Sequence, residues 1–118
     1  MKPQRAHRVG EQIQQELAQL LRSEVKDPRV GMVTITQVEV SADMAHAKVF
    51  FTNLEGREHA AEAERALGRT AGFLRSQLSH RLKLYTVPEL HFVYDDSIES
   101  GIRLAKLIDE AVGKQGTS

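Results

Sequence analysis

The sequence predicts an α+β fold in which helices cover one face of a small sheet. Three observations lead to this prediction. Apolar residues recur at helical spacing near the start, in the middle and near the end of the chain, and three other stretches alternate apolar and polar residues as strands do. Proline, aspartate and serine residues separate these stretches at positions typical of turns and helix starts.

The composition is that of one globular domain. The chain has 118 residues, of which 41% are hydrophobic and 27% are charged, and it contains no cysteine. Disulfides and cysteine-based metal sites are therefore excluded. The N-terminus lacks the apolar segment of a secretory signal, and no apolar run is long enough to span a membrane. We expect one domain over residues 1–112, a flexible tail over 113–118, and a cytoplasmic monomer.

The first helix is predicted from about Arg5 to Val25. Its apolar residues recur every three or four positions and form one stripe, which contains Val9, Ile13, Leu17, Leu20 and Leu21. We expect the helix to end at Asp27, because the following Pro28 disfavours helical backbone in the residue before it.

Two antiparallel strands are predicted next, from about Gly31 to Ser41 and from Ala45 to Thr52. The apolar positions of the first strand change phase between its two halves, so we expect a β-bulge near Thr36 and Gln37. One face of the second strand contains Ala45, Ala47, Val49 and Phe51.

The second half of the chain predicts a long helix, a third strand and a last helix. Helical spacing extends from about Arg57 to Leu82, and strand-like alternation follows from Val87 to Tyr94. The last helix is predicted from about Ser97 to Val112, and we expect its apolar stripe, like that of the first helix, to cover the sheet. That stripe contains Ile98, Ile102, Ala105, Ile108 and Val112.

An acidic cluster, made of Asp95, Asp96 and Glu99, lies where the last helix begins. Such carboxylates could bind a cation or act as acid–base groups. Their position at a helix start favours capping and compensation of the helix dipole instead.

Motifs of catalysis are missing from the sequence. It contains neither a P-loop nor the glycine pattern of dinucleotide-binding proteins. Metal-ligand spacing is also absent among the five histidines, which are His7, His46, His59, His80 and His91. We therefore expect no enzymatic activity, no cofactor, no metal and no small-molecule substrate.

Charge is unevenly distributed although the formal net charge is zero. Residues 1–10 contain three basic and no acidic residues, and residues 65–88 contain five basic and no acidic residues. The rest of the chain is acidic. A basic face of this kind favours a polyanionic ligand, while the alternative is ordinary solvated charge.

Two glycines, Gly68 and Gly72, interrupt the polar face of the long helix, and each costs about 1 kcal/mol relative to alanine. They could allow the helix to bend, or they could let a phosphate backbone approach closely with its oxygens near main-chain N–H groups. The alternative is that they pack against a neighbouring helix. The same face contains Arg65, Arg69, Arg75, Ser76, Ser79 and Lys83.

Several separated stretches resemble the ribosome-binding factor A family. They are RVGEQIQQELAQLL, DPRVGMVTITQVEVSADMAHAKVFF, TAGFLRSQLSHRLKLYTVPELHFVYDDS and SGIRLAKLI, which cover almost the entire chain. The resemblance implies a type II KH-like fold with a small three-stranded mixed sheet and helices on one face. It also implies an interhelical kink at an Ala-x-Gly motif, which corresponds here to Thr70, Ala71 and Gly72. Thr70 departs from the usual alanine.

The resemblance further implies a function. We expect an assembly factor that binds the free or immature small (30S) ribosomal subunit and assists late maturation of its 16S rRNA, including processing of the 5′ end. Other assembly factors are possible partners, and importance in cold adaptation is implied. The alternative is a protein-interaction module that uses its amphipathic terminal helices.

We predict that basic side chains and the kink contact the rRNA backbone. The candidate RNA-binding residues are Arg65, Arg69, Gly72, Arg75, Ser76, Arg81 and Lys83, with Arg5 and Arg8 as secondary candidates. Arg81 projects towards the apolar side of the helix, so its alternative role is to cap the helix end.

Overall fold

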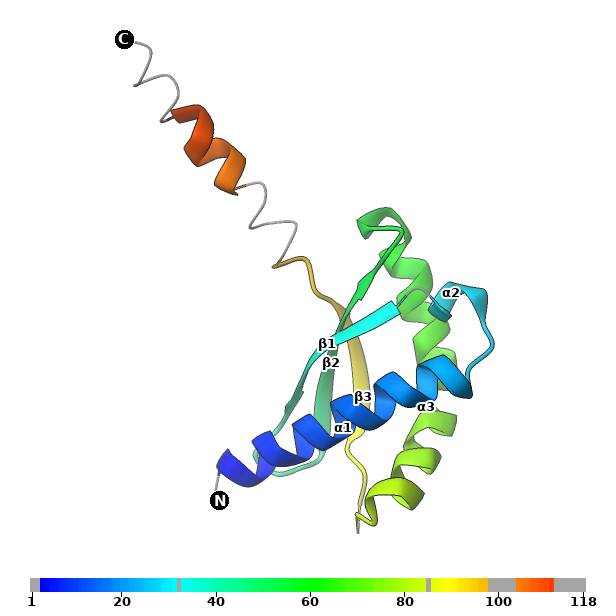
Figure 1. Cartoon of the computed structure of the whole chain (residues 1–118). Coiled ribbons are helices and arrows are strands. Elements are labelled where there is room, and N and C mark those ends of the chain that lie inside the picture. Colours follow the sequence, from blue (N-terminus) through cyan, green and yellow to red (C-terminus); the bar gives the residue numbers. More distant parts are fainter. Residues whose placement is uncertain (1–2, 32, 85, 98–103, 112–118) are drawn as a thin grey trace.

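The helices and strands follow one another in the predicted order (Figure 1). The computed structural model describes residues 3–31, 33–84, 86–97 and 104–111. Its elements are α1 (Pro3–Ser23), α2 (Pro28–Gly31), β1 (Val33–Val40), β2 (His46–Asn53), the short 3-10 helix η1 (Arg57–His59), α3 (Ala60–Leu82) and β3 (Glu89–Tyr94). The predicted α+β fold is confirmed.

The three strands form one mixed sheet in the order β1-β2-β3. Strands β1 and β2 are antiparallel, while β2 and β3 are parallel. The register of the first pair shifts between Ile35 and Gln37, which confirms the predicted bulge at Thr36. The Thr36 hydroxyl donates a hydrogen bond to the Asp95 carboxylate at 2.8 Å, so the bulge is tied to the segment after β3.

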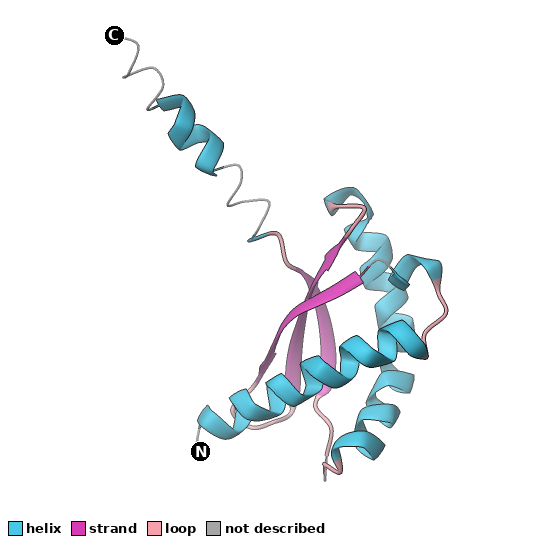
Figure 2. Ribbon diagram, in the orientation of Figure 1, coloured by secondary structure: helices cyan, strands magenta, loops and turns pink. Residues whose placement is uncertain are grey.

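Helices α1 and α3 pack on the same sheet, mainly against β1 and β3 respectively (Figure 2). Alternate side chains of β2 and β3 are buried beneath them, because successive strand residues point to opposite faces. In β1 the buried Ile35 and Val38 are three residues apart, because the bulge lies between them. The largest fully buried side chains come mainly from α1, β2 and α3 and include Ile13, Leu17, Leu20, Val49, Phe51, Leu67, Leu74 and Leu78. The other face of the sheet exposes polar side chains.

Helix α1 approaches β1 very closely at Gly10. A Cβ atom at this position would lie 2.7 Å from the carbonyl oxygen of Val38 and 3.6 Å from the side chain of Val40. Gly10 is buried, and the absence of its side chain lets the backbone of α1 lie directly against the backbone of β1.

The loop after α1 contains a short helix that the sequence pattern did not predict. The Asp27 carboxylate accepts a hydrogen bond from the Arg29 N–H at 3.0 Å, which caps the start of α2. Pro28 occupies the first helical position, where its missing N–H costs nothing. Pro28 therefore begins a helix, and α1 has already ended at Ser23.

The C-terminal helix differs from its prediction. Residues 104–111 are helical, but all of their side chains are exposed. Figure 1 shows this helix apart from the sheet. Leu104, Leu107 and Ile108 are 53–59% exposed, so the expectation that the last apolar stripe covers the sheet is wrong for this segment. The stripe residues Ile98, Ile102 and Val112, like the predicted tail over 113–118, lie outside the described residues.

Candidate nucleic-acid interface

Helix α3 has one buried and one exposed face, as its sequence pattern predicts. The buried face contains Ala63, Ala66, Leu67, Leu74 and Leu78. The exposed face contains Arg65, Gly68, Arg69, Gly72 and Ser76. We call these five exposed residues the α3 face. Two arginines thus flank two glycines along about three helical turns.

The two glycines of the α3 face have open space above them. Apart from its chain neighbours and the backbone of its own helix, a Cβ atom at Gly68 or Gly72 would meet no atom of the described residues within 4 Å. The alternative that these glycines pack against a neighbouring helix is therefore wrong. Among the described glycines, only Gly56 has a positive φ, so left-handed backbone does not explain them either.

The helix is continuous across Thr70, Ala71 and Gly72, because α3 extends without interruption from Ala60 to Leu82. The Thr70 hydroxyl donates back to the carbonyl oxygen of Leu67 at 2.9 Å and is 3.5 Å from that of Ala66. This kind of back-bonding favours bending of a helix. The structure therefore does not divide α3 into two helices at the predicted interhelical kink.

A groove beside the α3 face contains residues that the sequence prediction missed. It is formed by Arg69, Thr70 and Phe73 on α3 and by the loop that contains Asp27 and Arg29. Phe73 is 44% exposed and lines this groove together with Arg29 and Arg69.

Within this groove, Arg29 is held by Asp27. The guanidinium donates from Nε and Nη2 to the two carboxylate oxygens at 3.0 and 3.1 Å. This bidentate contact, with a smaller contribution from Arg69, lowers the pKa of Asp27 below its ordinary value. Arg29 is nevertheless an exposed cation close to the α3 face. The sequence analysis did not select it, because it lies far from α3 along the chain.

Three further candidates on or beside α3 have different environments. Arg75 is exposed, and its Nη2 donates to the carbonyl oxygen of Val87 at 3.0 Å. Lys83 ends the helix in a left-handed conformation with φ of 53° and is exposed. Arg81 contacts Gln19 at 3.5 Å and Glu16 at 3.8 Å, which joins the end of α3 to α1. Arg81 therefore has a structural partner and does not belong to the α3 face.

The secondary candidates, Arg5 and Arg8, are exposed in the first turns of α1. In Figure 1 this end of α1 lies away from α3. The two basic segments of the sequence are therefore not brought together into one surface.

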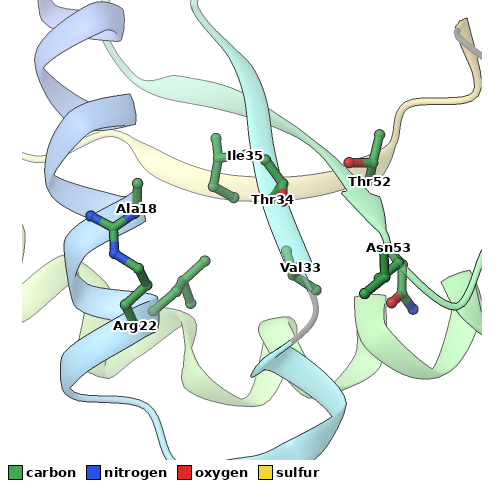
Figure 3. A pocket seen from close by; sticks show the side chains of 9 residues that line it. Ala18, Arg22, Val33, Thr34, Ile35, Thr52 and Asn53 are labelled. Carbon is green, nitrogen blue, oxygen red and sulfur yellow. The ribbon is translucent and has the colours of Figure 1, made fainter.

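A separate hollow lies between α1 and the ends of β1 and β2 that are nearest α2 (Figure 3). Its lining combines one cation, Arg22, with apolar and threonine side chains such as Ala18, Val33 and Thr52. No predicted site residue lines it. The predicted interface and this hollow are thus different places.

The acidic cluster has structural partners. Asp95 accepts hydrogen bonds from the Ser97 N–H at 3.0 Å and from the Thr36 hydroxyl at 2.8 Å, and the contacts with Ser97 and Thr36 lower its pKa. Asp96 forms an ion pair with Arg57. Glu99 lies outside the described residues. These contacts agree with the capping interpretation for Asp95 and give Asp96 a role in joining η1 to the end of β3.

Comparison with known proteins identifies the family. The family model described as Ribosome-binding factor A matches residues 5–108. Ribosome-binding factor A of Methylobacillus flagellatus is 63% identical over 109 residues, which cover 92% of this chain and 85% of that protein. The protein of the same name from Nitrosospira multiformis is 58% identical over 108 residues, which cover 92% of this chain and 86% of that protein.

Solved structures agree with the sequence comparison. The crystal structure of ribosome-binding factor A from Thermus thermophilus matches with a TM-score of 0.68 and 26% identity, covering 75% of this chain and 93% of that one. A Thermus thermophilus homology model that was fitted into a cryo-EM map of a 30S complex matches with a TM-score of 0.65 and 27% identity, covering 78% of this chain and 96% of that one. The KH-like fold is thereby confirmed, and the chain belongs to the ribosome-binding factor A family.

Proposed function

We propose that this protein is an assembly factor that binds the immature 30S ribosomal subunit through the α3 face. The observation that carries the proposal is the pair of exposed glycines with open space above them, Gly68 between Arg65 and Arg69 and Gly72 between Arg69 and Ser76. The relative that has been fitted into a map of a 30S complex supports the choice of partner.

The arginines and the glycines have different roles in this proposal. Arg65 and Arg69 neutralise phosphates, and the exposed Arg75 and Lys83 extend the positive surface. Because α3 is continuous, its central N–H groups are occupied by helical hydrogen bonds. The glycines therefore supply space for the sugar–phosphate chain and not additional amide donors.

Binding of this kind favours one conformation of the rRNA. A protein that binds one conformer better shifts the population towards it by no more than the difference in affinity, and no ATP is required. We propose that the favoured conformer is an intermediate of late 16S rRNA maturation, including processing of the 5′ end. The effect would be greatest in the cold, when misfolded RNA escapes slowly. The protein acts as a cytoplasmic monomer beside other assembly factors.

A second candidate function is protein recognition through residues 104–111. The exposed Leu104, Leu107 and Ile108 favour it, because exposed apolar patches often mark interaction sites. Helix α1 does not favour it, since its apolar stripe is buried against the sheet.

The salt dependence of 30S binding distinguishes the two candidates. Four exposed cations on and beside the α3 face predict that log affinity falls with log salt concentration with a slope of about −2.8 to −3.6. Apolar docking predicts a nearly flat line. We expect Arg65→Glu with Arg69→Glu to reduce the magnitude of the slope by at least about 1.4.

A matched control is Arg22→Glu with Lys48→Glu. Both residues are exposed and lie away from the α3 face, and the change in net charge is the same. An equal loss of affinity in both double variants would mean that only net charge matters, and the proposed face would be rejected.

A further inference from the structure

The sheet face opposite α1 and α3 brings together two histidines that are 45 residues apart in sequence. His46 begins β2, and His91 lies in β3. The two strands are parallel neighbours, and their register pairs His46 with Glu89. Glu89 and His91 point to the same face because they are two residues apart in one strand. All three side chains are exposed.

The donor atoms of these residues converge. His46 Nδ1 lies 3.0 Å from His91 Nε2 and 3.7 Å from a carboxylate oxygen of Glu89. One donor atom from each residue lies within 4.8 Å of the other two, and this is the only such triplet of His, Asp or Glu in the part of the chain that the structure describes. Tetrahedral ligands at zinc distances of about 2.0–2.1 Å lie about 3.3 Å apart. The two separations from His46 Nδ1, 3.0 and 3.7 Å, bracket that value.

The side chains also have the right chemistry. Without a metal, two imidazole nitrogens at 3.0 Å require one ring to donate its N–H and the other to accept. A cation placed between the two rings would be bound by the lone pair of one nitrogen from each imidazole. The charged neighbours on this side are Lys48, which is paired in register with Glu39 of β1 and with His91 of β3, and Asp43 near His46. The surroundings are thus not positively charged overall.

We propose that His46, Glu89 and His91 bind a divalent late first-row transition metal ion, Zn²⁺ in particular. Two imidazoles and one carboxylate are a ligand set that suits such an ion, and the exposure of the site leaves its remaining coordination positions to water. Spacing in the sequence could not reveal the site, because the ligands come from two strands that meet only in the folded sheet.

Metal binding here would join β2 to β3. The unfolded chain does not hold the three ligands together, so the ion would stabilise the folded state by mass action. The site lies on the other side of the sheet from α3, so the proposal is independent of the proposed RNA contacts.

The test is a Zn²⁺ titration of the full chain without a polyhistidine tag, followed by calorimetry and by thermal unfolding. We expect binding of one ion and a rise in melting temperature. His46→Gln and His91→Gln should each weaken binding by at least about tenfold and abolish the rise. Because both side chains are exposed, the metal-free variants should melt at the wild-type temperature.

The matched control is His59→Gln. His59 Nδ1 lies 3.6 and 3.9 Å from the carboxylates of Glu55 and Glu62, but that group contains one imidazole and its donor atoms do not all converge. This variant should bind Zn²⁺ like the wild type. The proposal is overturned if the wild type shows no binding of one ion, or if His46→Gln and His59→Gln bind equally well.

Discussion

The two long helices use glycine for opposite purposes. In α1, Gly10 is buried and faces the backbone of β1, where a Cβ atom would lie 2.7 Å from the Val38 oxygen. In α3, Gly68 and Gly72 face open space, and a Cβ atom would contact no described residue. The same residue type therefore supports packing in one helix and lowers helix stability without a packing benefit in the other. We attribute the loss of helix stability at Gly68 and Gly72 to the proposed function of the α3 face.

Replacement of Gly10 gives the largest expected change in stability. Gly10→Ala places a methyl group against main-chain atoms that cannot rotate away, so α1 must move from β1. Overpacking of this kind predicts a decrease of about 2 kcal/mol in the free energy of unfolding. Chemical denaturation measures it. Increased stability would contradict the packing role of Gly10 and the comparison with α3.

The corresponding changes in α3 have the opposite expected sign. Gly68→Ala and Gly72→Ala should each raise the free energy of unfolding by about 1 kcal/mol, because alanine is the better helix former and the space is free. The measurement is again chemical denaturation. Destabilisation by either change would show that the glycine has a structural role, and the contrast between the helices would disappear.

This contrast shows what sequence patterns can and cannot predict. The phase change between Ile35 and Val38 predicted the bulge correctly, because strand periodicity is a local property. The helical wheel placed Gly68 and Gly72 on the exposed face for the same reason. Gly10 was missed, because the closeness of a helix to a strand depends on how both pack.

Local sequence patterns also could not predict which side chains contact one another in the fold. The wheel showed Arg81 turned from the polar face, but not that Glu16 and Gln19 on α1 would meet it. Asp27 and Pro28 were interpreted as a helix end, although together they begin α2. The His46–His91 contact depends on the parallel pairing of two strands, which no spacing along the chain encodes.

A smaller effect separates the two kinds of arginine. Arg81→Ala should lower the free energy of unfolding by about 0.5 kcal/mol, because it removes a partly buried ion pair between α3 and α1, and should leave 30S affinity unchanged. Arg69→Ala should weaken 30S binding and leave the free energy of unfolding unchanged. Both variants are compared by denaturation and by co-sedimentation with purified subunits. If Arg81→Ala weakened 30S binding and Arg69→Ala did not, the interface would lie on the side of α3 that faces α1, and the proposed α3 face would be rejected.

The smallest effect concerns the bulge that precedes Val38, on the strand that Gly10 contacts. The contacts with Ser97 and Thr36 lower the pKa of Asp95 below its ordinary value of 3.8. They therefore stabilise the fold at pH values above 3.8, and this stabilisation is lost as the pH falls through the lowered pKa. Asp95→Asn should therefore lose less melting temperature than the wild type on acidification through this range. Identical losses would show that the ionised Asp95 carboxylate does not stabilise the fold through its contacts with Ser97 and Thr36.

The most direct test of the central claim is Gly72→Leu, measured for both stability and 30S affinity. A leucine here would fill the space above the α3 face, and its Cβ atom would meet no neighbouring element within 4 Å. We predict at least about tenfold weaker binding, which corresponds to about 1.4 kcal/mol, with a melting temperature equal to or above that of the wild type. Unchanged affinity would contradict the account, as would a large fall in melting temperature with intact binding.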